Sequence, residues 1–267
     1  MTTIAILAII LYLFSWVLLG FKLRSRLKNT TQLNKKIYLS VWSIAILLHA
    51  IVLYYPLLVG NGLLLSMIAA ASHIIWLTSL MLLITTWTRD VEALGIFILP
   101  LTAFTLLLQQ TVPLNSNHTI QISNGLGVHI FTSLLAYSML MLAAIQAALL
   151  AEQNNHLHNH KPTGLIRALP SLQDMEHLLF RFITLGVILL SISLVTGLIY
   201  LENLFGHGIA HKTILSIFAW LIFTTLLIGH LKFGWRGRTA IRWTLAGFII
   251  LMLAFFGSKI IQHFLGI

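Results

Sequence analysis

Histidine is the residue type in this chain best suited to chemistry. The sequence holds 12 His, no Cys and only 6 Asp plus Glu. His129 opens one apolar segment, in Gly125-Leu126-Gly127-Val128-His129, and His211 opens another, directly before Lys212. A neutral imidazole nitrogen is a good axial ligand for haem iron, and two imidazoles from separate helices could hold a porphyrin between them. We therefore predict His129 and His211 as ligands of haem iron, with Lys212 placed to meet a haem propionate.

A plainer interpretation of His129 and His211 is an interfacial histidine that hydrogen-bonds to water or to a neighbouring carbonyl. His49 lies inside the second apolar segment. An ionisable group within a membrane is a functional candidate by default, so we predict His49 as a further haem contact. The alternative for His49 is a neutral imidazole hydrogen-bonded between helices. The expected cofactor is haem b, held stably or in transit.

The acidic residues all lie in connections or at the ends of apolar segments. They are Asp90, Glu92, Glu152, Asp174, Glu176 and Glu202. Proton-coupled carriers usually place carboxylates within the bundle, and Mg²⁺ and Ca²⁺ pathways need oxygen ligands. No nucleophile elbow is present either, so a serine hydrolase is unsupported. We expect a protein that is not an enzyme.

The elements that must position these histidines are transmembrane helices. The chain is 58% hydrophobic and 8% charged, with a mean hydropathy of +0.95. One crossing of the hydrocarbon core takes roughly 20 apolar residues. Apolar runs of about this length fall near 3–21, 37–55, 62–87, 91–110, 126–151, 177–201, 212–231 and 241–264. The sequence predicts an all-α, polytopic bundle of about eight transmembrane helices, forming a single domain over residues 1–267.

The positions of the basic residues predict the orientation. The first connection holds six Lys or Arg between Lys22 and Lys36, and the third, fifth and seventh connections are basic as well. The second, fourth and sixth connections contain no Lys or Arg. Basic loops stay in the cytoplasm, so we predict that both termini lie outside and that His129 and His211 share one outer level. The net charge of +10 is explained in this way, and nucleic acid is not an expected partner.

Several runs of residues resemble the cytochrome c assembly membrane-protein family (CcsA/HemX-like), and within it the short, eight-helix YpjD-type branch. They are 129–148, Met175-Glu176-His177-Leu178-Leu179-Phe180-Arg181, 211–220, Gly234-Trp235-Arg236-Gly237-Arg238-Thr239-Ala240 and Phe256-Gly257-Ser258-Lys259. The likeness covers nearly the whole chain and is strongest after residue 125. It implies a protein that carries or presents haem for attachment to apocytochrome c, in which His129 matches an outer histidine and His49 an intramembrane one.

The chain departs from the family pattern in its sixth connection. The resemblance implies a Trp-Trp-Asp type motif there, and the sequence reads Leu201-Glu202-Asn203-Leu204-Phe205-Gly206-His207-Gly208-Ile209-Ala210-His211 instead. The family's second outer histidine has only His263 as a match, and His211 is a candidate substitute. The resemblance therefore implies haem handling more strongly than presentation of haem to an apocytochrome.

The leading hypothesis is a multi-pass protein of the bacterial inner membrane that binds or handles haem and assists cytochrome c assembly or haem metabolism. Its expected partners are the lipid bilayer, haem and other proteins of cytochrome c maturation or haem synthesis. One alternative is an accessory protein for divalent-cation (Mg²⁺ or Co²⁺) transport. Another is a non-catalytic structural subunit of a membrane complex.

Overall fold

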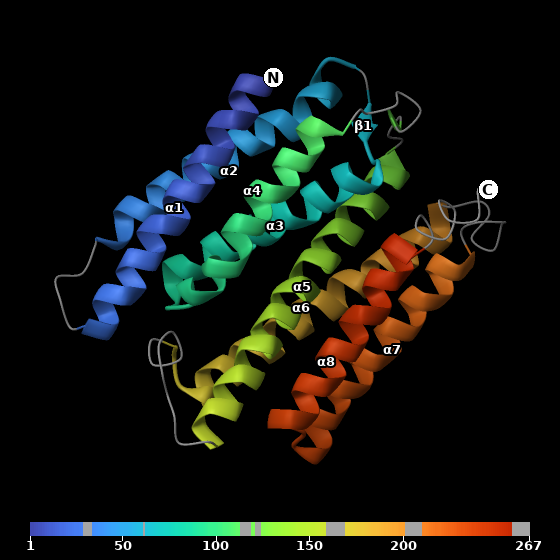
Figure 1. Ribbon diagram of the computed structural model, residues 1–267. Helices are drawn as coiled ribbons and strands as arrows, with labels where there is room; N and C mark the ends of the chain where they lie inside the picture. Colours follow the sequence, from blue (N-terminus) through green and yellow to red (C-terminus); the bar gives the residue numbers. More distant parts are fainter. Residues whose placement is uncertain are drawn as a thin grey trace. The chain divides into compact units, whose positions relative to one another are not determined.

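The computed structural model describes residues 1–28, 34–60, 62–112, 119–120, 124–158, 169–200 and 210–257. Within these ranges the chain is almost wholly helical (Figure 1). The helices are α1 (Thr2–Lys28), α2 (Lys35–Leu58), α3 (Met67–Thr88), η1 (Glu92–Leu94), α4 (Gly95–Thr111), α5 (Asn124–His158), α6 (Leu172–Tyr200), α7 (Ala210–Phe233), α8 (Gly237–Met252) and η4 (Leu253–Gly257). The strands are β1 (Leu63–Leu64) and β2 (Thr119–Ile120).

Eight helical segments in the described residues are long and apolar enough to cross a membrane. Each contains an 18-residue window with no more than two Asp, Glu, Lys or Arg. Their 20 to 32 residues match or exceed the roughly 20 residues that one crossing requires. The predicted all-α, polytopic membrane protein is confirmed.

The chain divides into two compact units. Unit 1 comprises Met1–Ile122 and His156–Pro170, and unit 2 comprises Ser123–Asn155 and Ser171–Ile267. In unit 1, α1 packs against both α2 and α4, and α3 packs against α4. In unit 2, α7 packs against α6 and α8. That the two units act as a single domain over residues 1–267 stays a prediction.

The first helix of unit 1 packs through small residues. Ala5 and Ala8 of α1 are fully buried against Val52 of α2 and Leu106 of α4. In a membrane the lipid is as apolar as a leucine side chain, so helices associate mainly through close packing. Alanines on one face of α1 permit that close approach.

The third apolar run of the sequence becomes two elements. Leu63 and Leu64 pair antiparallel with Ile120 and Thr119, and α3 begins only at Met67. The Ser66 side chain caps α3 by accepting a hydrogen bond from the Ala69 N–H at 3.2 Å. This cap satisfies a backbone donor that the helix itself leaves unpaired.

The Gly-Trp-Arg-Gly-Arg run forms the tight turn between α7 and α8. Gly234 and Gly237 have φ angles of +67° and +54°, in the left-handed region that glycine adopts without steric cost. The Trp235 N–H donates to the Gly229 carbonyl at 3.1 Å, and the Trp235 carbonyl accepts from His230 Nδ1 at 2.9 Å. The glycines of this motif therefore serve backbone geometry.

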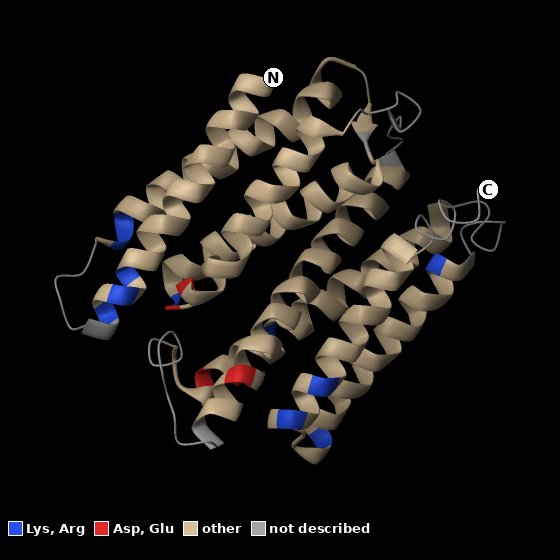
Figure 2. Ribbon diagram, in the orientation of Figure 1, with Lys and Arg blue, Asp and Glu red and all other residues tan. Residues whose placement is uncertain are grey.

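Most charged residues gather at one end of each unit, and Lys212, at the start of α7, lies at the other end of unit 2 (Figure 2). In unit 1 they lie where α1 ends, α2 begins and α3 gives way to α4. In unit 2 they lie mainly where α7 ends and α8 begins, and where α6 begins. This arrangement fits the alternation of basic loops from which the orientation was predicted.

Candidate functional site

His129 lies in the second turn of α5, and its ring is held in place from α6. Its Nδ1 is 2.9 Å from the backbone carbonyl oxygen of Ser193. A carbonyl only accepts, so Nδ1 carries the proton and Nε2 keeps its lone pair in the neutral ring. Ser133 adds a second link between α5 and α6 beside this contact, because its hydroxyl is 2.6 Å both from the His129 carbonyl and from Ser193 Oγ. Metal-ligating histidines typically have this arrangement, with one nitrogen donating to a carbonyl and the other free to ligate.

His211 lies in the first turn of α7. Its Nε2 is buried and has no hydrogen-bond partner within the described part of the chain. A buried polar atom without a partner is costly, and native structures rarely keep one without a reason such as a ligand, an ion or a water. Lys212 is the next residue of the same turn.

The helices that carry His129 and His211 are neighbours in unit 2. Their first turns lie at the same end of that unit (Figure 1). The Tyr137 side chain of α5 interacts with the Ser216 side chain of α7. These contacts lie roughly two turns beyond His129 and one to two turns beyond His211, at 3.6 residues per turn. The predicted pair is therefore placed on adjacent helices near one end of the unit.

The donor set of this pair fits haem iron. His129 offers a lone pair on a ring fixed by a hydrogen bond, and His211 offers a buried nitrogen with no competing partner. Neutral imidazole is a common axial ligand of haem. What fits haem iron is the donor chemistry of these two nitrogens. His263, the other candidate from the sequence, lies outside the described residues.

His49 belongs to unit 1 and is fully buried in a hydrogen-bonded network between helices. Its Nδ1 lies 3.4 Å from the Tyr12 hydroxyl of α1, and its Nε2 lies 3.0 Å from Ser72 Oγ of α3. Both ring nitrogens are thus engaged. This geometry favours the alternative interpretation of His49, a neutral histidine that links helices. Its contact with haem stays a prediction.

A second intramembrane histidine, His73, lies close to this network. Its Nδ1 donates to the Ala69 carbonyl at 2.7 Å, and its Nε2 is buried with no partner among the described residues. The Tyr54 ring packs edge-on against it, with ring centroids 5.5 Å apart. His73 falls within the apolar run 62–87, and nothing in that run indicated these contacts.

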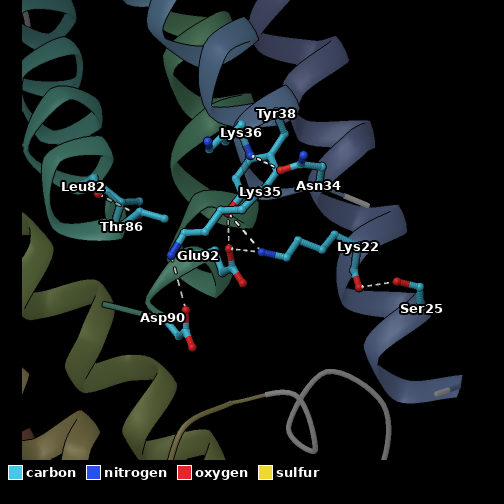
Figure 3. A network of polar contacts seen from close by, with 10 residues as sticks. All are labelled: Lys22, Ser25, Asn34, Lys35, Lys36, Tyr38, Leu82, Thr86, Asp90 and Glu92. Carbon is cyan, nitrogen blue, oxygen red and sulfur yellow. Dashed lines mark hydrogen bonds and ion pairs between the residues drawn. The ribbon is translucent and has the colours of Figure 1, made fainter. Parts of the chain in front are cut away.

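An ion pair at the charged end of unit 1 was not predicted. Lys22 Nζ of α1 lies 2.7 Å from Glu92 Oε2 of η1, and the two side chains are only 8% and 3% exposed. The Tyr38 hydroxyl of α2 donates to the same Glu92 oxygen and accepts from Lys22 at 3.2 Å (Figure 3). Lys35 and Asp90 form a second, more exposed pair at 3.3 Å. The sequence showed Lys22 in the basic first connection and Glu92 in the third, but it gave no signal that the two side chains would pair.

The described residues contain no cluster of side chains that would coordinate a metal ion directly. No group of three or more His, Cys, Asp or Glu side chains there could hold a metal ion. The cation-transport alternative therefore gains no support from the geometry.

The model of the Cytochrome C assembly protein family matches residues 38–265. The chain belongs to this family. The matched range includes His49, His129 and His211, and it confirms the family resemblance predicted from the sequence.

Three proteins with different names illustrate what this chain is similar to. Inner membrane protein YpjD of Escherichia coli strain K12 is 40% identical over 144 residues, which are 54% of each chain. Protein HemX of Brevibacillus brevis is 26% identical over 147 residues, again 54% of each. Cytochrome c biogenesis protein CcsA of Prochlorococcus marinus strain NATL1A is 25% identical over 114 residues, covering 42% of this chain and 35% of that protein. The matches thus span about half of these relatives or less, and no solved structure matches the chain significantly.

Proposed function

We propose that this protein acts in cytochrome c biogenesis as a multi-pass protein of the bacterial inner membrane that binds haem at the outer ends of α5 and α7. His129 and His211 supply nitrogens to the haem iron, and Lys212 lies at the level of a propionate. Haem is the cargo in this proposal, and this chain breaks no bond in it. Family membership supports the role in biogenesis, and the name of the Escherichia coli relative supports the inner membrane.

The observation that supports the proposal most directly is the hydrogen bonding of the His129 and His211 imidazoles. The hydrogen bond from His129 Nδ1 to the Ser193 carbonyl fixes the ring and leaves the lone pair on Nε2. His211 Nε2 is buried without a partner in the described residues, so a ligand there would remove an energetic cost. Two such nitrogens supply the donor chemistry that axial ligation of haem by two histidines uses.

The test is a haem titration of the purified full chain, followed by its Soret absorption. The wild-type protein is expected to shift the Soret band and to bind about one haem per chain. The His129→Ala/His211→Ala variant is expected to lose the shift, or to weaken haem binding by roughly tenfold or more, as a loss of about 1.4 kcal/mol would do. A double variant that shifts the band as wild type does would contradict the proposal.

Two single variants serve as controls. His177→Ala removes an exposed histidine at the start of α6, at the other end of unit 2, and should leave the titration unchanged. His49→Gln separates the two interpretations of that residue. If His49 only links helices, the variant keeps the Soret shift and loses thermal stability, because it disturbs the contacts with Tyr12 and Ser72. Loss of the shift with stability unchanged would instead make His49 a haem contact.

A further inference from the structure

A cavity of about 260 Å³ opens at the charged end of unit 2, away from the two candidate haem ligands. It is lined by the last turns of α5 and the first turns of α8. The lining residues are Ala151, Asn154, Asn155, Arg238, Ile241 and Arg242. Pockets for drug-sized ligands are usually about 300–1,000 Å³, so this cavity suits a smaller group.

The polar lining of the cavity is suited to an anion. Arg238 and Arg242 are four residues apart on α8 and therefore share one face of the helix. Like charges at this spacing repel, and an anion held between them relieves the repulsion. Two guanidinium groups also present planar, bidentate donors that match phosphate oxygens. The carboxamides of Asn154 and Asn155 add further donors, and no carboxylate lines the cavity.

The arginine side chains supply the formal positive charge for this binding. The first backbone N–H of α8, that of Gly237, already donates to Glu176 Oε1 at 3.3 Å. Arg236, at the N-cap of α8, makes no side-chain cap hydrogen bond. The positive charge available to a ligand in the cavity is therefore that of Arg238 and Arg242.

The surroundings favour a lipid over a soluble anion. The cavity lies at the end of two membrane-crossing segments, at the end of unit 2 where basic side chains gather. Trp235 and Trp243 pack nearby with ring centroids 5.4 Å apart, and tryptophan is enriched at the level of lipid headgroups. Ala151 and Ile241 give the cavity an apolar wall, which suits the carbon backbone of a lipid but offers nothing to a free ion.

We propose that this cavity binds the phosphate of an anionic membrane phospholipid, with Arg238 and Arg242 as the principal contacts. Basic pockets between membrane helices on the cytoplasmic side are suited to such headgroups. The site is independent of haem, and its loss need not alter the Soret titration.

Native mass spectrometry of the full chain in a neutral detergent tests the site. The probes are phosphatidylglycerol and phosphatidylcholine, each added over a concentration series. Wild type is expected to retain phosphatidylglycerol in preference to phosphatidylcholine. Arg238→Ala/Arg242→Ala is expected to lower the apparent affinity for phosphatidylglycerol about tenfold. Arg238→Lys/Arg242→Lys should recover only part of it, because lysine keeps the charge but loses the planar fork.

The matched control is Lys232→Ala/Arg236→Ala, which removes the same charge from exposed positions that do not line the cavity. It is expected to stay within about twofold of wild type. An equal loss in this control would overturn the proposal, because diffuse attraction to the basic end would then explain the binding. Full displacement of the lipid by millimolar inorganic phosphate would also overturn it in favour of a soluble anion. Size-exclusion profiles identify any variant that has not folded.

Discussion

Glu92 shows how strongly a single residue can depend on its partner. Lys22 and Glu92 are both almost fully buried, and Tyr38 completes their hydrogen bonding. Burying one charge alone is expensive, whereas a close, hydrogen-bonded pair recovers much of the cost. The pair joins α1 to η1, directly before α4, and Tyr38 adds a contact from α2. These contacts therefore link three helices of unit 1 at their charged end.

Glu92→Gln is expected to destabilise the protein strongly, because it leaves Lys22 buried without a counter-charge. Breaking a buried pair on one side costs about 3–5 kcal/mol. The free energy of unfolding in mixed micelles, measured by titration with sodium dodecyl sulfate, is the appropriate readout. Lys22→Met combined with Glu92→Gln should be more stable than Glu92→Gln alone, since the unpaired charge is then gone.

Asp90→Asn is the matched control for this prediction. The Lys35–Asp90 pair has side chains that are 33% and 63% exposed, so solvent screens it. Exposed pairs contribute about 0–1 kcal/mol. If the Asp90 and Glu92 variants lost stability equally, the buried pair would not have the role described here.

Sequence reasoning could place individual side chains by depth but could not find their partners. It put His129 and His211 at the start of their helices, and both are there. It could not show that the His129 ring bonds to Ser193, because that carbonyl is 64 residues away and any residue carries a carbonyl. The Lys22–Glu92 contact spans 70 residues and was missed for the same reason. Contacts between residues close in sequence follow local patterns: Ser171 and Asp174, three residues apart, cap the start of α6.

At the scale of elements, Gly186 lets α5 and α6 pack closely. A Cβ added at Gly186 of α6 would lie 2.6 Å from Leu140 Cδ2 and 2.7 Å from Leu140 Cγ. Leu140 of α5 is fully buried, so its side chain has little room to move. Small residues at membrane helix interfaces let backbones pack closely, and Gly186 meets that requirement.

Gly186→Ala is therefore expected to lower the thermal unfolding temperature, with a cost of about 1–3 kcal/mol from overpacking. Gly20→Ala in α1 is the matched substitution, because a Cβ there meets nothing within 4 Å. It should be neutral or stabilising by about 0.5–1 kcal/mol, since alanine favours the helix. Thermal unfolding of the two variants side by side decides the matter, and equal melting temperatures would argue against close packing at Gly186.

The elements themselves were largely predictable, and the exceptions have physical reasons. Apolar length alone located all eight membrane segments, because the bilayer sets a minimum number of residues for each crossing. The β1–β2 pair was missed because two leucines in an apolar run look the same in a helix as in a strand. The turn between α7 and α8 was seen only as a family motif, although its two positive φ angles explain why both glycines stand there.

At the scale of the molecule, orientation is the feature on which the proposed function depends. The haem proposal requires the starts of α5 and α7 to face outward, and the lipid proposal places the start of α8 at the cytoplasmic leaflet. Both follow from one assignment, in which the basic connections are inside and both termini outside. The chain contains no cysteine, so a single introduced thiol reports its own position without background.

Val112→Cys and Thr239→Cys test this orientation in intact cells with a membrane-impermeant maleimide. Val112 is exposed at the end of α4, which the assignment places outside, and Thr239 is exposed near the start of α8, which it places inside. We expect Val112→Cys to be labelled in intact cells and Thr239→Cys to be labelled only after the membrane is permeabilised. The cysteine-free parent sets the background. The reverse pattern would place His129 and His211 at the cytoplasmic face, and haem binding at the outer face would have to be abandoned even if the Soret titration succeeded.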